Sequence, residues 1–134
     1  VMLKKYDYHC PSCDRLISKE NLLHFVVMDT KGVKAPLTLS AYPGVYGYTA
    51  DQHLTINTGD NIDFFCTSCD ASLTSERFPD YVEMRLSTPN GGMMEVLFSP
   101  VCGQEESLVM VNGKPVNYLD NFVSVQFSED PTES

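Results

Sequence analysis

The sequence predicts an all-β protein built from antiparallel sheets, sandwich-like and with little helix. Hydrophobic residues alternate with polar ones in several short runs, which is the pattern of strands with one buried face. Asn, Gly and Pro, the residues of tight turns, separate these runs. No segment of three helical turns or more shows clean helical periodicity.

The expected strands follow one another along the chain. The run 22–28 is almost continuously apolar, interrupted by His24, and we expect it to be a buried strand. Short turns of helix fit the sequence near 71–77 and 116–121. The other strands are expected at 37–41, 53–57, 62–66, 80–88, 93–98, 108–111, 114–116 and 123–127.

Three clear turn signals lie between these strands. Residues 89–92 should close a hairpin between the strands at 80–88 and 93–98. The Asn-Gly pair at 112–113 is a strong hairpin signal. Residues 58–61 should turn the chain into the strand at 62–66.

The length of 134 residues suits one domain with a hydrophobic core, and we expect a single β domain over residues 1–127. The polar, acidic tail at 128–134 is expected to be disordered. The net charge is −9, which argues against nucleic acid and anionic membrane surfaces as partners. The charge is uneven, because fourteen of the eighteen Asp and Glu residues lie in 35–134.

Two Cys-x-x-Cys motifs lie in segments that are near copies of each other. Residues 6–18 read YDYHCPSCDRLIS, and residues 62–74 read IDFFCTSCDASLT. At an offset of 56 residues, five positions are identical. These positions are Asp7, Cys10, Ser12, Cys13 and Asp14 in the first segment, and Asp63, Cys66, Ser68, Cys69 and Asp70 in the second.

The paired motifs predict a metal site. A Cys-x-x-Cys turn places two sulfurs on one side of a tight loop, and two such turns supply the four thiolates of a tetrahedral Zn²⁺ shell. We therefore expect one structural zinc held by Cys10, Cys13, Cys66 and Cys69, which would clamp the N-terminal half of the chain. A filled shell leaves no position for water or substrate. Iron in the same cage, redox-active cysteine pairs and isolated buried thiols are the alternatives.

The two segments resemble the knuckles of zinc ribbon proteins, in which Cys-Pro-x-Cys is a frequent form of one half. The first motif has this proline, Pro11, whereas the second has Thr67. Many ribbons place Gly after the second Cys, where the backbone tends to be left-handed. Asp14 and Asp70 stand there, and Asp tolerates that conformation better than most residues. The 52 residues between the motifs indicate strands inserted into a ribbon, and the resemblance implies a metal site without implying an activity.

The remaining chemically notable residues have ordinary interpretations. Cys102, the cysteine outside the motifs, is expected to be a buried, inert thiol rather than a nucleophile. His9, His24 and His53 are expected to be structural, with His9 as an alternative ligand beside Cys10. No signal peptide or membrane-spanning run is visible, so we expect a reducing, cytoplasmic location.

The segment 41–48 is a candidate surface for binding a protein partner. It carries Tyr42, Tyr46 and Tyr48 with Gly and Pro between them, which makes an amphipathic and rigid loop. The alternative is that these rings pack over the edge of a sheet. Unpaired sheet edges also leave an edge-to-edge homodimer open.

Catalytic motifs such as a phosphate loop or a nucleophile elbow are not found in the sequence. We expect a non-enzymatic zinc-binding protein that acts as an interaction or adaptor module. A protein partner with a basic surface would fit the acidic charge of residues 35–134. Two alternatives stay open: a thiol-based redox sensor, and a nucleic-acid-binding zinc ribbon protein that uses Lys4, Lys5, Arg15 and Lys19.

Overall fold

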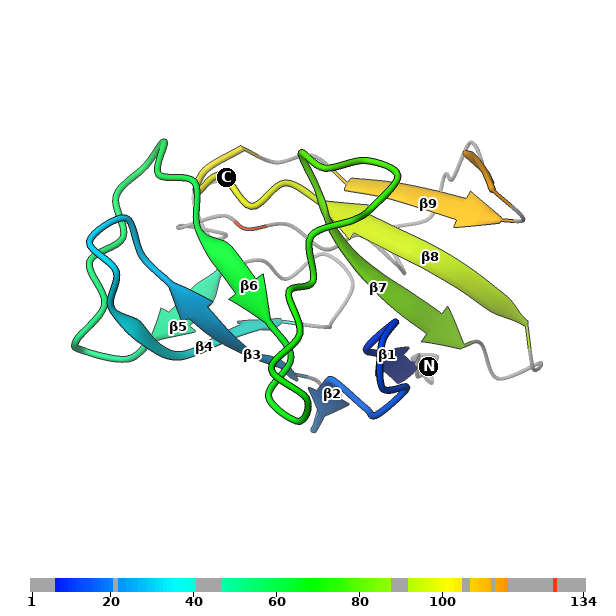
Figure 1. The fold of residues 1–134 in the computed structure, drawn as a ribbon, viewed down its shortest axis with the longest axis horizontal. Coiled ribbons are helices and arrows are strands. Elements are labelled where there is room, and N and C mark those ends of the chain that lie inside the picture. The colour runs from blue at the N-terminus through cyan, green and yellow to red at the C-terminus, as the bar shows by residue number, and fades with distance from the viewer. Residues whose placement is uncertain are drawn as a thin grey trace, which may run out of the picture.

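A computed structural model describes residues 7–20, 22–40, 47–87, 92–104, 107–111, 113–115 and 127 of the chain. Within these residues there are ten strands and no helix, and the strands form two antiparallel sheets (Figure 1). The predicted all-β, antiparallel fold class is therefore confirmed. Among the described residues, no helix has the length and apolar character to cross a membrane.

The first sheet is built mainly from the first half of the chain. Its strands are β2 (Ser18–Lys19), β3 (Leu22–Met28), β4 (Lys34–Ser40), β5 (Tyr48–Ala50) and β6 (Asp63–Phe65). They pair in the order β2-β3-β4-β5, and β6 pairs with β3. The central strand β3 thus has β4 along one edge, with β2 and then β6 along the other.

The second sheet is built mainly from the second half. Its strands are β1 (Asp7–His9), β7 (Val82–Ser87), β8 (Met93–Phe98), β9 (Ser107–Val111) and β10 (Lys114–Pro115). They pair in the order β1-β7-β8-β9-β10. The N-terminal strand β1 lies beside β7, whereas β2, which follows it closely in sequence, belongs to the other sheet (Figure 1).

The two halves exchange one strand each. Strand β1 leads into the first cysteine motif, yet it pairs with β7 of the second half, with Tyr8 opposite Leu86. Strand β6 leads into the second motif, yet it pairs with β3 of the first half, with Phe64 opposite Val27. Because both exchanged strands lead into a cysteine motif, the exchange brings the two motifs to the junction between the halves.

The strand register repeats between the two halves, which identifies the chain as an internal structural duplication. In the pairs β7–β8 and β8–β9, each residue lies 59 positions after its counterpart in the pairs β3–β4 and β4–β5. The matching pairs are Leu23–Leu39 with Val82–Phe98, Met28–Lys34 with Ser87–Met93, and Leu37–Ala50 with Val96–Val109. The offset is 56 in the cysteine motifs and 59 afterwards, because the link that follows the motif is three residues longer in the second half.

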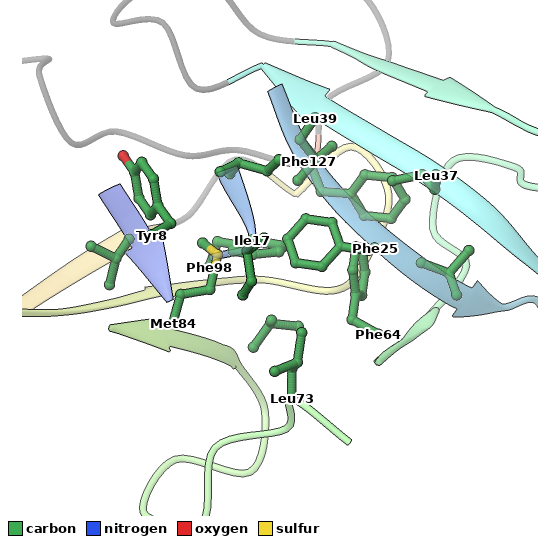
Figure 2. Packing of buried hydrophobic residues seen from close by; sticks show 14 of the residues in the cluster. Tyr8, Ile17, Phe25, Leu37, Leu39, Phe64, Leu73, Met84, Phe98 and Phe127 are labelled. Atoms are coloured by element: carbon green, nitrogen blue, oxygen red, sulfur yellow. The ribbon is translucent and has the colours of Figure 1, made fainter. Parts of the chain in front are cut away.

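The buried residues follow the same repeat and form one hydrophobic core shared by both sheets. The ring of Phe64 meets those of Phe25, Phe98 and Phe127 edge-on at centroid distances of 5.1, 5.3 and 5.4 Å, and Figure 2 shows these residues packed together. Buried residues occupy corresponding positions in the two halves. They are Tyr8 with Phe64, Ile17 with Leu73, Leu23 with Val82, Phe25 with Met84, Val27 with Leu86, Leu37 with Val96, and Leu39 with Phe98.

Two expectations about secondary structure are wrong. Residues 53–57 form no strand, since the backbone amide of Thr55 donates to the Asp29 carboxylate at 2.9 Å instead of to a neighbouring strand. Residues 71–77 form no turn of helix, because Ser72 and Thr74 make isolated bridges with Phe65 and Val82.

Other expectations agree with the structure or fall outside its described part. The run 22–28 is a strand as predicted, but its side chains alternate between buried and more exposed, so one face alone is buried. The turn at 89–91, Asn112, the region 116–126 and the tail at 128–134 lie outside the described residues.

Candidate metal centre

The structure brings the four motif cysteines together, as the sequence predicts. The sulfurs of Cys10, Cys13, Cys66 and Cys69 all lie within 4.8 Å of one another. Across the two motifs, Cys10 Sγ is 3.8 Å from Cys69 Sγ, and Cys13 Sγ is 3.7 Å from Cys66 Sγ. A tetrahedral zinc with Zn–S bonds of about 2.3 Å needs sulfurs about 3.8 Å apart. The four sulfurs therefore fit one metal ion.

Both motifs have the same backbone hydrogen bonds. In the first, the amide of Asp14 donates to the carbonyl of Cys10 at 2.9 Å, and the amide of Cys10 donates to the carbonyl of Arg15 at 2.9 Å. In the second, the corresponding distances are 3.0 Å from Asp70 to Cys66 and 3.0 Å from Cys66 to Ala71. The sequence repeat thus corresponds to a repeated loop geometry, which we call the first and second knuckle.

The residue after each second cysteine has a left-handed backbone, as expected. Asp14 has a φ of 64° and Asp70 a φ of 61°. Each of these aspartates also faces a cation from the opposite half of the chain. Asp14 Oδ1 is 3.7 Å from Arg85 Nη1, and Asp70 Oδ1 is 2.8 Å from Lys34 Nζ. Asp thus supplies an ion pair at a position where Gly would supply conformational freedom alone.

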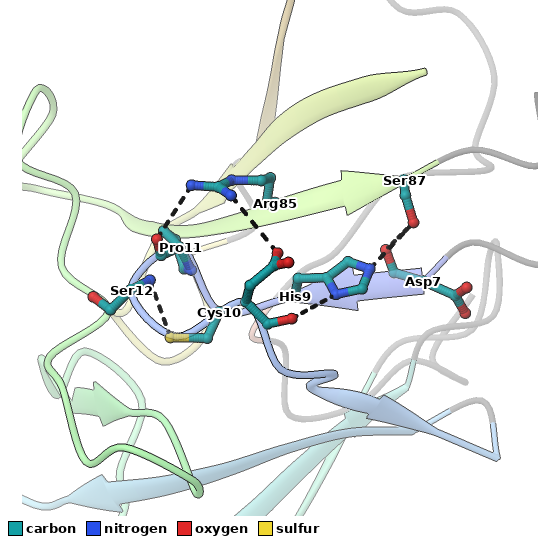
Figure 3. Close-up of polar contacts among 8 residues, drawn as sticks. Asp7, His9, Cys10, Pro11, Ser12, Arg85 and Ser87 are labelled. Carbon is teal, nitrogen blue, oxygen red and sulfur yellow. Dashed lines mark hydrogen bonds and ion pairs between the residues drawn. The ribbon is translucent and has the colours of Figure 1, made fainter. Parts of the chain in front are cut away.

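Backbone amides also point at the sulfurs. The amide of Ser12 donates to Cys10 Sγ at 3.3 Å, and the amide of Ser68 donates to Cys66 Sγ at 3.3 Å (Figure 3 shows the first). Such bonds offset part of the charge of a metal-bound thiolate. They come from the knuckle turn itself, so each knuckle supplies a donor to its own first sulfur.

The thiols of the cluster differ in their pKa values. Burial raises the pKa of Cys10 to about 12, although the amides of Cys13 and Ser12 oppose the rise. Burial would also raise the pKa of Cys66, but the amides of Cys69 and Ser68 and the neighbouring thiols outweigh it and lower that pKa to about 7. A divalent cation would let all four thiols ionise together, releasing protons as it binds.

The four cysteines differ in exposure. Cys10 and Cys66, the first cysteine of each knuckle, are buried, with exposed fractions of 0% and 2%. Cys13 is half-buried and Cys69 is exposed. The centre therefore lies at the surface, with the second knuckle more open to solvent than the first.

His9 is positioned beside the centre without being a ligand. Its Nδ1 donates to the carbonyl of Asp14 at 3.1 Å, because a carbonyl oxygen can only accept, and its Nε2 lies 3.2 Å from Ser87 Oγ (Figure 3). Arg85 adds a hydrogen bond from Nη2 to the carbonyl of Pro11 at 3.2 Å. Sequence reasoning missed Arg85 and Lys34 because nothing in their spacing connects them to the cysteines.

The other candidate residues lie outside this cluster. Cys102 is buried, as expected, in a turn where its amide donates to the carbonyl of Asp60 at 2.9 Å. His53 is exposed, with Nδ1 2.7 Å from Asp51 Oδ1, and His24 is half-buried in β3. Tyr48 is half-buried, and its ring lies 5.2 Å from that of Phe127. Tyr42 and Tyr46 lie outside the described residues.

No protein-family model, curated protein or solved structure matches the chain. The fold and the site by themselves define an all-β protein in which four cysteines from two repeated knuckles are positioned to hold one metal ion.

Proposed function

We propose that Cys10, Cys13, Cys66 and Cys69 hold one Zn²⁺ whose role is structural. The observation that carries this proposal is the spacing of the four sulfurs, which matches a tetrahedral thiolate shell. Four protein ligands fill that shell and leave no position for a substrate, which supports a non-catalytic role. Iron would fit the same cage.

The position of the site supports a clamp between the two halves. Each knuckle follows a strand that belongs to the opposite sheet, β1 in one case and β6 in the other. A metal that joins the knuckles would fix both exchanged strands at their ends. It would therefore stabilise the arrangement of the two sheets as well as the knuckle loops.

The first test is native mass spectrometry of protein purified without added metal, repeated after denaturation. We expect one zinc per chain in the native spectrum and none after unfolding. An iron centre would instead absorb visible light. A metal-free native protein would contradict the proposal.

The second test removes ligands. Cys10→Ser and Cys66→Ser should each lose the metal and lower the thermal midpoint by about 5 °C or more, because a structural zinc contributes folding free energy directly. Cys102→Ser is the matched control, since that thiol lies outside the cluster. It should keep the metal, whatever its effect on packing. Wild-type stability in both cluster variants would show that the site is not structural.

We further propose that the protein is a non-enzymatic adaptor whose partner has a basic surface. The support is the acidic balance of residues 35–134 and a cleft of about 480 Å³ in the second half. Asp63 and Asp80 line this cleft beside Tyr81 and Gln104, which suits a cationic side chain with an apolar stem.

This proposal is tested with an arginine-rich peptide and a single-stranded oligonucleotide as probes, using fluorescence anisotropy at low and physiological salt. We expect salt-sensitive binding of the peptide, weakened roughly tenfold by the double change Asp63→Asn and Asp80→Asn. Glu20→Gln, an exposed change in the first half, is the control. Binding of the oligonucleotide alone would favour the nucleic-acid alternative.

A further inference from the structure

The four sulfurs of the proposed metal centre differ in how far they are exposed to solvent. The first cysteine of each knuckle is buried, whereas Cys69 is exposed and Cys13 is half-buried. Because the reactivity of a thiolate depends on access as well as on charge, Cys69 is the sulfur that a dissolved electrophile reaches most easily.

The hydrogen bonds of the cluster add to this asymmetry. Cys10 Sγ accepts the amide of Ser12, and Cys66 Sγ accepts the amide of Ser68, each at 3.3 Å. An amide that donates to a thiolate withdraws charge from the sulfur and makes it a weaker nucleophile. These bonds make the two buried sulfurs weaker nucleophiles, and exposure favours Cys69.

The sulfur neighbours of Cys69 decide what an oxidised form could become. Cys10 Sγ lies 3.8 Å away and belongs to the other knuckle. The remaining two sulfurs, those of Cys13 and Cys66, form a second cross-knuckle pair at 3.7 Å. Both of these cross-knuckle pairs join the same two chain segments that a shared metal ion would join, although the sulfurs within one knuckle also lie within 4.8 Å of each other.

We propose that hydrogen peroxide oxidises the centre at Cys69, that Cys10 then forms a disulfide with it, and that this bond replaces the metal as the link between the two halves. This inference rests on the proposed metal site and adds a mode of regulation to it. The protein would be a thiol switch that gives up its zinc without losing the connection between its knuckles.

The chemistry balances with peroxide as the oxidant. The Cys69 thiolate attacks one oxygen of hydrogen peroxide, the O–O bond breaks, and a sulfenic acid and hydroxide form. The Cys10 thiolate then attacks the Cys69 sulfur, the S–O bond breaks, and a second hydroxide leaves. Two protons convert the two hydroxides to water. The two sulfurs together lose two electrons, peroxide gains them, and the metal ion leaves in its original oxidation state.

Oxidation would affect the link between the knuckles differently from simple removal of the metal. A chelator would leave four free thiols and unlink the knuckles. Oxidation would leave a covalent bond between residues 10 and 69, which restricts the unfolded chain in place of the metal. Peroxide-treated protein should therefore be more resistant to denaturation than chelator-treated protein, and a thiol reductant should restore metal binding when zinc is supplied.

The experiment treats the zinc-loaded full-length chain with hydrogen peroxide. Zinc release is followed with a chromogenic chelator, and disulfides are mapped by mass spectrometry of a non-reduced digest. We expect zinc release together with a first disulfide between Cys10 and Cys69. A first disulfide within one knuckle, either Cys10–Cys13 or Cys66–Cys69, would overturn the inference, since such a bond cannot link the halves.

A matched pair of variants tests the role of Cys69. Cys69→His and Cys13→His each keep four ligands, because zinc accepts three cysteines and one histidine. We expect Cys69→His to slow zinc release by roughly tenfold and Cys13→His to change it by less than about twofold. Equal slowing in both variants, or greater slowing in Cys13→His, would overturn the assignment of Cys69. Cys102→Ser should release zinc at the wild-type rate.

The outcomes separate this inference from the proposed function. If the chain binds zinc and retains it under peroxide, the structural site stands and the switch is wrong. If the chain binds no zinc, the proposed function itself fails, whatever disulfides peroxide then forms.

Discussion

The two halves of the chain share one strand plan but differ on the outer faces of their sheets. In the second half, the longer segment between the knuckle and β7 makes side-chain contacts with the outer face of the sheet. Ser75 Oγ donates to the Glu83 carboxylate at 2.7 Å, and Arg77 forms an ion pair with Glu95 at 3.1 Å. On that face Leu97 and Met110 are buried. In the first half, the link is shorter, and the equivalent positions Thr38 and Asp51 are partly exposed.

The comparison shows which features the duplicated fold requires. Strand register, core positions and knuckle geometry are repeated closely. The outer surface is not repeated, and neither is the exposure of the second cysteine in each knuckle. The features that involve both halves, which are the shared core and the four-cysteine cluster, are therefore repeated more closely than the surface that one half forms alone.

The first prediction tests whether core residues at equivalent positions of the two halves contribute equally to the stability of the fold. Ile17 and Leu73 follow the two knuckles and are both buried, with exposed fractions of 3% and 2%. Ile17→Ala and Leu73→Ala should each lower the free energy of unfolding by about 2–5 kcal/mol, because each removes buried methyl groups next to a knuckle. Urea unfolding measures both.

The losses in free energy of unfolding of the two variants should agree within about 1 kcal/mol if the two halves contribute equally to stability. A large cost for one and almost none for the other would show that the repeated geometry hides an unequal distribution of stability. Leu16→Ala is a useful control, since Leu16 is adjacent to Ile17 in sequence but 55% exposed. Its effect should be much smaller.

A second prediction concerns Asp29, a buried carboxylate of the first half. Its Oδ1 accepts the amides of Lys31 and Val33, and its Oδ2 accepts the amide of Thr55, each at 2.9 Å. These bonds, led by those from Thr55 and Val33, lower the pKa of Asp29 below its usual value. Ionised Asp29 thus stabilises the fold above about pH 4, and this contribution is lost as the pH falls through the lowered pKa.

Asp29→Asn should therefore be less stable than wild type at neutral pH, because an amide nitrogen cannot accept a bond from a backbone amide. The difference should shrink as the pH falls below about 4. Thermal unfolding across this pH range provides the measurement. Asp51→Asn is the comparison, since the bonds to Asp51 come from the exposed His53, and its effect should be smaller. A constant difference at every pH would contradict this account.

Much of the fold and the ligand set could be predicted from the sequence, because both depend on local patterns. Alternation of apolar residues located β7 and β8 closely, and a nearly continuous apolar run located β3. The paired motifs identified all four clustered cysteines. The left-handed Asp14 and Asp70 also followed from their positions in the knuckles.

What the sequence did not reveal depends on contacts between distant segments. The strand exchange pairs β1 with β7, and no local pattern specifies such a partner. The duplication beyond the knuckles was missed because core positions keep their apolar character but not their identity, as with Phe25 and Met84. The strand expected at 53–57 failed because a side chain, that of Asp29, takes up a backbone amide there.

The smallest expected effect concerns the aspartates after the two knuckles. Asp14 and Asp70 have left-handed backbones, which most side chains adopt at a cost of about 1 kcal/mol. Asp14→Ala and Asp70→Ala should each be destabilising by about that amount. Asp14→Gly and Asp70→Gly should be nearly neutral, because Gly adopts this conformation freely and the lost ion pairs are at the surface.

Any difference in stability between the two Gly variants would measure the unequal contributions of the two ion pairs. The Lys34–Asp70 pair is closer, at 2.8 Å against 3.7 Å for Arg85–Asp14. Asp70→Gly should therefore lose slightly more stability than Asp14→Gly at low salt, and the two should converge at high salt. If instead both Gly variants were as unstable as their Ala counterparts, the carboxylates themselves would hold the knuckles in place, and backbone conformation would not be the reason that Asp stands at these positions.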